Sequence, residues 1–445
     1  MLHTLLASVL SLAAAQQSTP GAPPTPVAPA PAAMPAPPAA PSGSADPSAT
    51  RRTPNPQVAA ILARSLMPAP HAARMERALA IAGLGERFTK DAVTAAAAKA
   101  TAGYATWRAT AEPTLTESIR AAVDADPGLG FPRRCKAQII AAWDEGAAFE
   151  RDAFATLISS ALPDGDAAGT LARAALAAGQ AQALRSTLAY GPLVDFWQAD
   201  MLESSLRAAA GASVSPDQLR EMLSGYESER ARLLRDICEA VLEAESRRRQ
   251  VLTMAAEWYR NRAGASADMV RMPGAMQLAE PLINATLVDA GARMAAFQRR
   301  TAQQVAGVFA PEGAWSIYTS LLASGRKDSP AVRIDSVVAA IAELPEDRRE
   351  EARTMLREFC TTDRAAMLKT VDAAVDALEM QARIVKPAQR VEAIAGLDLD
   401  ALKAQLQAVP TREAAYGTLS AIDARKRAVS ELERKIRALA ETETK

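Results

Sequence analysis

Apolar residues recur at spacings of three and four positions along most of the chain from residue 58 to residue 445, as they do on one face of an α-helix. The clearest run follows Pro216 and consists of Leu219, Met222, Leu223, Tyr226, Leu233, Leu234, Ile237, Val241 and Leu242. It predicts one long amphipathic helix that continues to about Arg262 and is roughly 70 Å long at 1.5 Å per residue. The fold class that we expect is all-α, with long antiparallel helices in a bundle-like or repeat arrangement.

Capping residues and prolines mark the expected starts of these helices. In Ser215-Pro216-Asp217-Gln218 the serine is an N-cap, the proline stands at the first helical position, and the glutamine completes a capping box. The spacing Thr114-x-x-Glu117 predicts a second capping box. Proline also predicts three further helix starts, at Ser329-Pro330, Ala310-Pro311-Glu312 and Leu344-Pro345-Glu346.

The first 57 residues have a different pattern. Residues 1–15 contain an apolar run from Leu5 to Leu12 and then Ala13-x-Ala15, which predicts a signal peptide and an exported protein, either periplasmic or secreted. Residues 16–57 hold 13 of the 28 prolines. This composition predicts a disordered Pro/Ala-rich tether that reaches at most about 130 Å. No later run approaches the roughly 20 apolar residues that span a bilayer, so we expect no transmembrane helix after signal removal.

The sequence also contains an internal match. Residues 147–151, AAFER, match residues 295–299, AAFQR, and the same spacing of 148 pairs Pro163-Asp164-Gly165 with Pro311-Glu312-Gly313. A second match pairs Tyr104 with Tyr226 and Arg108 with Arg230 at a spacing of 122. The two spacings differ by 26, so the second copy is expected to carry about 26 extra residues between Tyr226 and Phe297.

A fainter third copy begins near Met355-Leu356, so we divide the chain after the tether into helical units at 58–190, 191–328 and 329–445.

Charge and composition exclude several classes of function. Lysine plus arginine equals aspartate plus glutamate, at 51 each, which argues against a nucleic-acid-binding protein because such proteins need a clustered basic excess. After the signal only His71 remains, which argues against His-based triads and multi-histidine metal sites, and we expect no cofactor. The basic run Arg247-Arg248-Arg249 follows Glu243 and Glu245 by four residues, which favours a solvated, salt-bridged helix face.

The three cysteines, Cys135, Cys238 and Cys360, lie more than 100 residues apart. Buried thiols are the favoured interpretation, and one disulfide with one leftover thiol is the alternative.

One short segment resembles a known family. The stretch VSPDQLREML at 214–223 is similar to the L-T-P-E-Q segment of the LTxxQ-motif periplasmic proteins, the Spy- and CpxP-like group, with Val214, Ser215 and Gln218 among the matching positions. The looser echo LPEDRREEARTML occupies 344–356. The resemblance implies an all-helical periplasmic protein that binds unfolded clients or senses envelope stress and has no catalytic site.

A second resemblance implies an enzyme. The stretch GAMQL at 274–278 is similar to the Gly-Leu-Met-Gln loop of lytic transglycosylases, and VFAPEGAWSIYTSLL at 308–322 resembles the helix that follows it there. The resemblance implies that Glu257 is the general acid, although Trp258 replaces the serine of the family's Glu-Ser pair. From chain geometry alone we expect Met272–Glu280 to be a helix exit, a proline-glycine turn and the first turn of the next helix.

The function that we expect is an exported, non-enzymatic helical binding, chaperone-like or scaffold protein of the cell envelope. The alternative is a peptidoglycan-cleaving enzyme that uses Glu257. Its partners are expected to be proteins or unfolded clients, with no nucleic acid. The last helix, with Ile422, Val429, Leu432, Ile436 and Leu439 at coiled-coil-like spacing, is expected to pack on its own chain, and dimerisation is the alternative. The sequence leaves the oligomeric state open.

Overall fold

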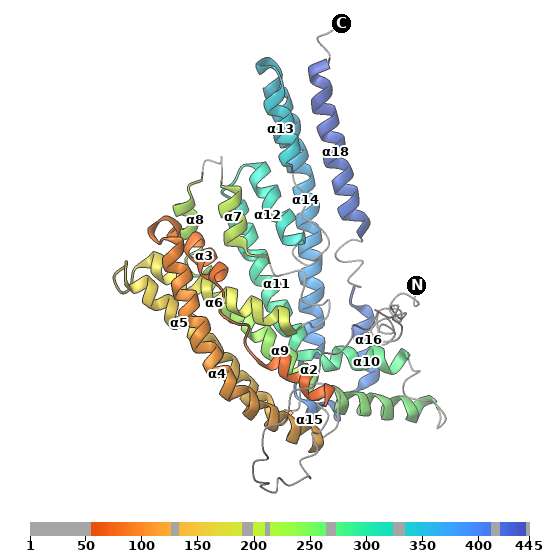
Figure 1. The fold of residues 1–445 in the computed structure, drawn as a ribbon. Coiled ribbons are helices and arrows are strands. Elements are labelled where there is room, and N and C mark those ends of the chain that lie inside the picture. Colours follow the sequence, from red (N-terminus) through yellow and green to blue (C-terminus); the bar gives the residue numbers. More distant parts are fainter. Residues whose placement is uncertain are drawn as a thin grey trace, which may run out of the picture. The chain divides into compact units, whose positions relative to one another are not determined.

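The computed structural model describes residues 55–125, 133–188, 199–209, 214–263, 273–323, 334–410 and 419–441, and within these ranges the regular structure is helical without strands. The predicted all-α fold is confirmed. The expected signal peptide, nearly all of the expected tether and the helix start at Ser329-Pro330 lie outside these ranges. Figure 1 labels the α-helices in chain order.

The elements of the first half are α2 (Pro56–Ser65), α3 (Ala72–Ile81), η1 (Gly85–Arg87), α4 (Lys90–Ala125), η2 (Arg133–Cys135), α5 (Lys136–Ser159), α6 (Ala167–Leu188), α7 (Met201–Ala208) and α8 (Pro216–Met222). Those of the second half are α9 (Tyr226–Ala263), α10 (Pro273–Ile283), α11 (Ala285–Ala306), α12 (Pro311–Ala323), α13 (Asp335–Glu343), α14 (Glu346–Val385), η5 (Lys386–Gln389), α15 (Val391–Ile394), α16 (Leu399–Ala408) and α18 (Leu419–Glu441).

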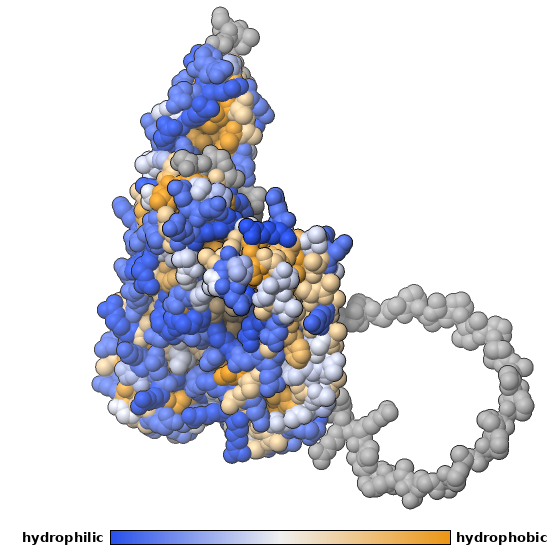
Figure 2. All heavy atoms as spheres, turned by 90° about the vertical axis from the view of Figure 1, so that its left-hand side faces the viewer, coloured by the Kyte–Doolittle hydropathy of each residue, from blue (hydrophilic) through white to orange (hydrophobic). Residues whose placement is uncertain are grey.

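Residues Pro54–Lys445 form one compact unit with a continuous hydrophobic core. The core is built mostly from alanine, leucine, isoleucine and valine, and a few large aromatic side chains such as Trp143, Trp315 and Phe154 are completely buried. On the surface of the described residues, the large hydrophobic side chains that are exposed are those of Val308, Val338 and Met380. Hydrophobic residues therefore lie among hydrophilic ones, as the face in Figure 2 shows. None of the helices in the described ranges is long and apolar enough to cross a membrane.

Helix packing recurs three times along the chain. A short helix packs against a helix that comes later in the chain: α3 against α6, α7 against α12, and α13 against α18. In addition, α6 packs against α9, and α12 packs against α14. We therefore define repeat 1 as α3–α6, repeat 2 as α7–α12 and repeat 3 as α13–α18. The last helix of repeat 1 covers the long helix α9 of repeat 2, and the last helix of repeat 2 covers the long helix α14 of repeat 3. The predicted unit boundaries at 190 and 328 lie outside the described residues.

The residues of the internal sequence match occupy equivalent places in repeats 1 and 2. Tyr104 on α4 donates a hydrogen bond to the backbone carbonyl of Met67, in the segment between α2 and α3. The Oη atom of Tyr226 on α9 lies 3.2 Å from the carbonyl oxygen of Ala199, just before α7. Each tyrosine therefore connects its long helix to the segment that leads into the short helix.

Positions 150 and 298 are also equivalent, and both side chains are fully buried. The Oε1 atom of Glu150 accepts a hydrogen bond from the backbone N–H of His71 at 2.9 Å. The Nε2 atom of Gln298 donates to the carbonyl oxygen of Ala199 at 2.9 Å. Both side chains thus hold the backbone at the start of the short helix, which gives the short AAFER and AAFQR match a structural meaning.

The extra residues of repeat 2 form a helical pair. Helix α9 continues to Ala263, and α10 packs back against it. The expected proline-glycine turn is wrong in position, because Pro273 and Gly274 already belong to the first turn of α10. Proline suits a first helical turn, where its missing N–H is not needed. Met272 lies outside the described residues.

The single long helix expected from Pro216 to Arg262 is also wrong. The chain breaks into α8 and α9, because Leu223 leaves helical geometry at φ −106° and ψ 24°. The capping box at Ser215 and Gln218 is confirmed, with both reciprocal hydrogen bonds present. The remaining helix, α9, has 38 residues and is therefore about 57 Å long.

The second expected capping box is wrong. Thr114 lies inside the 36-residue helix α4, and its hydroxyl donates to the carbonyl oxygen of Thr110 at 3.3 Å instead of capping a helix start. The helix continues through Pro113. Of the two other proline-led starts in the described ranges, α12 begins at Pro311 as expected, whereas Pro345 is the N-cap of α14 and precedes its first residue.

Cys135, Cys238 and Cys360 are buried free thiols, which confirms the favoured interpretation of the cysteines. Burial raises the pKa of Cys238 and of Cys360 to about 12 in each case. These thiols are consequently protonated and unreactive at neutral pH.

Candidate functional site

A charged groove runs along the seam between α9 and α11. Its larger part encloses a cavity of about 490 Å³, and a smaller part of about 350 Å³ adjoins it through the shared lining residues Asp289 and Arg293. We call the two parts together the α9–α11 groove. Its wall is the chain from Glu379 on α14 to Gln389 at the end of η5.

The floor of the larger part consists of small and apolar side chains. Ala292, Ala296 and Ala382 line it together with Leu233 and Phe297. Alanine side chains leave space above the helix backbones, so the groove is deeper than leucines at the same positions would permit. The ring of Phe297 stacks on the buried ring of Tyr226, with centroids 5.2 Å apart and an interplanar angle of 15°. This stacking fixes the floor against the core of repeat 2.

Ion pairs form the central rim of the groove. Arg293 on α11 lies 2.7 Å from the Oδ2 atom of Asp236 on α9, and 3.3 Å from a carboxylate oxygen of Asp289. Arg232 pairs with Glu229 at 2.6 Å. Hydrogen bonding from Arg232 lowers the pKa of the Glu229 carboxyl group. The Glu229 carboxyl group is therefore ionised, and all three acids of the rim are already paired with arginines.

The two ends of the groove differ in charge. At one end Arg300, Arg383 and Lys386 are exposed, and none of them forms an ion pair with a carboxylate among the described residues. The other end is lined by Asp236, Glu239, Glu243 and Lys136. There the cations of the same chain neutralise the acids, since Lys136 pairs with Glu243 at 2.7 Å and Arg235 pairs with Glu239 at 3.2 Å. Five cations and three acids line the larger part, so the groove has an excess of positive charge at the Arg300 end.

A buried ionic cluster lies behind the floor, where α3, α7 and α9 meet. Arg230 on α9 is 3.2 Å from Asp200, the N-cap of α7, and 3.4 Å from Glu227. Arg77 on α3 pairs with Asp200 and also with Glu203, the latter at 2.7 Å. The cluster adjoins the groove floor because Tyr226, which stacks on Phe297, accepts a hydrogen bond from the backbone N–H of Met201.

The two buried carboxyl groups of the cluster have opposite pKa shifts. Burial and the neighbouring Asp200 carboxylate raise the pKa of Glu227 well above its usual range. Burial also disfavours ionisation of Asp200, but Arg230 and Arg77 outweigh that effect and lower its pKa. Glu227 therefore keeps its proton to higher pH than an ordinary glutamate, whereas Asp200 is the carboxylate that pairs with both arginines.

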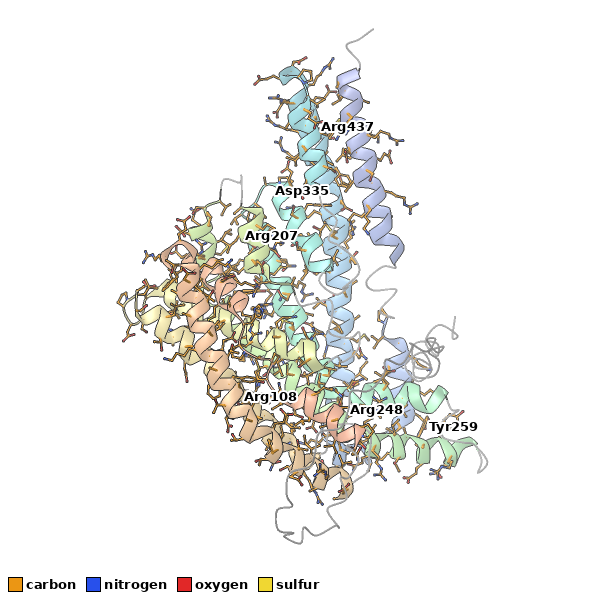
Figure 3. The ribbon with its side chains drawn as sticks, in the orientation of Figure 1. Arg108, Arg207, Arg248, Tyr259, Asp335 and Arg437 are labelled. Atoms are coloured by element: carbon orange, nitrogen blue, oxygen red, sulfur yellow. The ribbon has the colours of Figure 1, made fainter. Side chains whose placement is uncertain are left out.

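Glu257, the predicted general acid of the enzymatic alternative, is an exposed side chain on α9. Arg248 and Tyr259, labelled in Figure 3, mark the part of α9 that carries it. GAMQL at 274–278 begins α10, and the stretch that resembled the following helix forms the end of the α11–α12 connection and α12.

His71 is the N-cap of α3, where its Nδ1 atom accepts a hydrogen bond from the N–H of Ala73 at 3.1 Å. Within the described ranges, no group of three or more histidine, cysteine, aspartate or glutamate side chains is placed to hold a metal ion.

The LTxxQ-like segment forms α8 and lines a separate hollow of about 540 Å³. Val214, Gln218, Glu221 and Met222 line this hollow on the α8 side, and Val308 closes it from the α11–α12 connection. Capping by Ser215 and Gln218 explains the start of the helix, while Met222 and Val308 add apolar surface beside it.

The predicted solvated face at Arg247-Arg248-Arg249 is wrong for Arg247. Its side chain is buried, and its Nη1 atom donates to the carbonyl oxygen of Gln389 at 2.9 Å, with a second hydrogen bond to the carbonyl oxygen of Ala388. Glu243, its expected partner, pairs with Lys136 instead. Arg247 therefore joins α9 to the wall of the groove at the end of η5.

Sequence reasoning did not single out the groove residues. The available signal was the (i, i+3) and (i, i+4) spacing of acids and arginines on α9, which also describes an ordinary solvated helix. Arg293 and Asp236 are 57 residues apart in sequence, so their pairing depends on how α9 and α11 pack.

Comparisons with protein families, with curated proteins and with solved structures find no match to this chain. The resemblances of α8 to the LTxxQ-motif proteins and of residues 274–322 to lytic transglycosylases therefore stay predictions.

Proposed function

We propose that the chain is an exported, non-enzymatic binding or scaffold protein of the cell envelope that holds a segment of another protein in the α9–α11 groove. The groove carries this proposal: it combines an apolar floor, a rim of ion pairs and an excess of cations at one end. Such a surface can bury apolar side chains of a partner and orient its charged ones. Export is inferred from the small-residue pattern at Ala13-x-Ala15.

Glu229 in the groove and Glu227 behind it, the two glutamates there whose pKa is displaced, do not suit acid–base catalysis. A general acid must hold a proton near neutral pH and reach the substrate. Glu229 reaches the groove, but its pKa is lowered. Glu227 has a raised pKa, but its side chain is completely buried. Neither carboxyl group meets both requirements.

The chaperone-like form of this proposal can be tested with a reduced, unfolded client protein in the absence of ATP. We expect the full chain to suppress aggregation of the client, and Ala296→Phe, which fills the groove floor, to suppress it less. Ala105→Phe on the exposed face of α4 adds the same bulk away from the groove and serves as the control. Circular dichroism of both variants checks that the helices are intact.

Equal suppression by Ala296→Phe and the control would remove the groove from the proposal. Release of anhydromuropeptides from purified sacculi by the wild type, lost in Glu257→Gln, would replace the proposal with the enzymatic alternative.

A further inference from the structure

We infer that the segment held in the α9–α11 groove is an amphipathic helix of about four turns with a block of carboxylates at one end, which docks at Arg300, Arg383 and Lys386. This inference rests on the proposed function and specifies the partner of the same groove. It follows from the length of the groove, its floor and the distribution of its charges.

The length of the groove matches a short helix. On α11 the lining residues extend from Thr286 to Arg300, and on α9 they extend from Glu229 to Glu243. Both spans cover about 21 Å at 1.5 Å per residue, which is roughly four helical turns. The wall, from Glu379 on α14 to Gln389 in η5, lines both parts of the groove. A helix that lies along the seam would therefore contact α9, α11 and this wall.

The floor favours an apolar helix face. Ala292 and Ala296 lie four positions apart on α11, and Ala382 faces the same cavity from α14. Small side chains at this spacing allow a partner helix to approach closely, and Phe297 offers an aromatic surface for its larger side chains. An extended polyanion would leave this apolar floor uncovered.

The charges favour carboxylates at one end of that helix. Arg300 comes from α11 and Arg383 from α14, while Lys386 begins η5, so the three cations converge from two sides of one cavity. The only acids that line this cavity with them are Glu229, Asp289 and Glu379 among the described residues. Glu229 and Asp289 are paired with Arg232 and Arg293, and Glu379 lies 3.8 Å from Arg299. Arg300 also acts on Glu229 and helps to lower its pKa, but the cations of this cavity outnumber its acids, so a partner carboxylate meets an excess of positive charge.

The test uses fluorescence anisotropy with the full chain and two labelled, alanine- and leucine-rich helical peptides about four turns long. One peptide has its glutamates in a block at one end, and the other has the same glutamates spread along its polar face. We expect the block peptide to bind at least about tenfold more tightly, and its affinity to fall with rising salt.

Reversing two of the cations, in Arg300→Glu/Lys386→Glu, should remove this preference. The matched control is Arg87→Glu/Lys99→Glu, which makes the same change in net charge at exposed positions on η1 and α4 and should keep it.

The outcomes separate this inference from the proposed function. Equal binding of the two peptides, or a block-peptide preference that survives Arg300→Glu/Lys386→Glu, overturns the carboxylate-block inference. The proposed function then still stands if Ala296→Phe weakens suppression of client aggregation. Tighter binding of inorganic polyphosphate than of the block peptide would also overturn the inference, because it would assign the cations to a phosphate polymer. If neither peptide binds and Ala296→Phe has no effect on aggregation, both proposals fail.

Discussion

At the scale of single residues, the most consequential pair is Asp200 and Glu227. Both carboxyl groups are buried at the junction of α3, α7 and α9, beside two arginines, and their pKa values are displaced in opposite directions. A buried carboxylic acid that stays neutral needs little solvation, whereas two neighbouring carboxylates would repel each other. The proton on Glu227 thus permits Asp200 to pair with both Arg77 and Arg230 and still cap α7.

This proton has a consequence for stability. In the unfolded chain Glu227 ionises near its ordinary pKa of 4.5, whereas in the folded chain it keeps its proton to higher pH. The folded state therefore binds more protons above pH 4.5, so the free energy of unfolding falls as pH rises toward the raised pKa. Glu227→Gln, which keeps the shape without the ionisation, should flatten this fall and match or exceed the wild type near pH 8. Urea unfolding between pH 5 and pH 9 measures it.

Asp200→Asn is the companion variant, because Asp200 has its pKa shifted in the opposite direction. Removing its charge leaves Arg230 buried with less compensation, and we expect a loss of about 3–5 kcal/mol at neutral pH. A Glu227→Gln variant that loses as much stability as Asp200→Asn would contradict the opposite pKa shifts of the two carboxyl groups.

At the scale of helices, Pro113 is an unusual feature of α4. Proline in a helix interior removes one backbone hydrogen bond and crowds the preceding turn, at a cost of about 3 kcal/mol. Pro113 is exposed, so its replacement disturbs no core contact. Pro113→Ala should therefore raise the free energy of unfolding by about 1–3 kcal/mol, measured by urea denaturation.

Thr114→Ala is the informative control for this prediction. If Thr114 were an N-cap, its loss would cost about 1 kcal/mol. Inside α4 its hydroxyl only bonds the carbonyl oxygen of Thr110, so the alanine variant should be neutral or slightly more stable. A clear loss of stability in Thr114→Ala, or no gain in Pro113→Ala, would show that α4 is interrupted at this point.

The helices also show which parts of the fold the sequence could predict. Local chemistry placed the start of α8 correctly, because the capping box of Ser215 and Gln218 needs only neighbouring residues. The same spacing at Thr114 gave a wrong prediction of a helix start, since packing of α4 against α5 overrides the local capping signal there. Arg247 was expected in solvent because its partners, two carbonyl groups at Ala388 and Gln389, lie more than 140 residues away.

At the scale of the whole molecule, the internal match is visible in the sequence, but the groove is not. The equivalence of Glu150 and Gln298 is visible as a constant spacing in the sequence. The groove, by contrast, exists only because α9, α11 and α14 pack with alanines facing one another, and Ala292 and Ala382 resemble any other alanine in an alanine-rich chain. The exposed cations Arg300, Arg383 and Lys386 likewise stand out only when the ion pairs of the neighbouring acids are known.

The repeat architecture predicts how the molecule responds to loss of its last helix. Helix α18 packs against α13 and α14 of its own chain, and Val429, Leu432 and Ile436 are buried there. Polar contacts join the same elements, since Arg437 on α18, labelled in Figure 3, lies 3.0 Å from Glu343 on α13. Arg425 and Asp363 add a pair at 2.7 Å.

Removing residues 411–445 should therefore expose the apolar faces of α13 and of the first half of α14. Because each repeat contacts mainly its neighbours, the loss should weaken repeat 3 and leave repeat 1 intact. We expect hydrogen–deuterium exchange to become faster in α13 and in Glu346 to about Asp363, with α4, α5 and α6 as protected as in the full chain. Loss of protection in α4–α6 would mean that Pro54–Lys445 unfolds as one cooperative body and that the repeats are energetically inseparable.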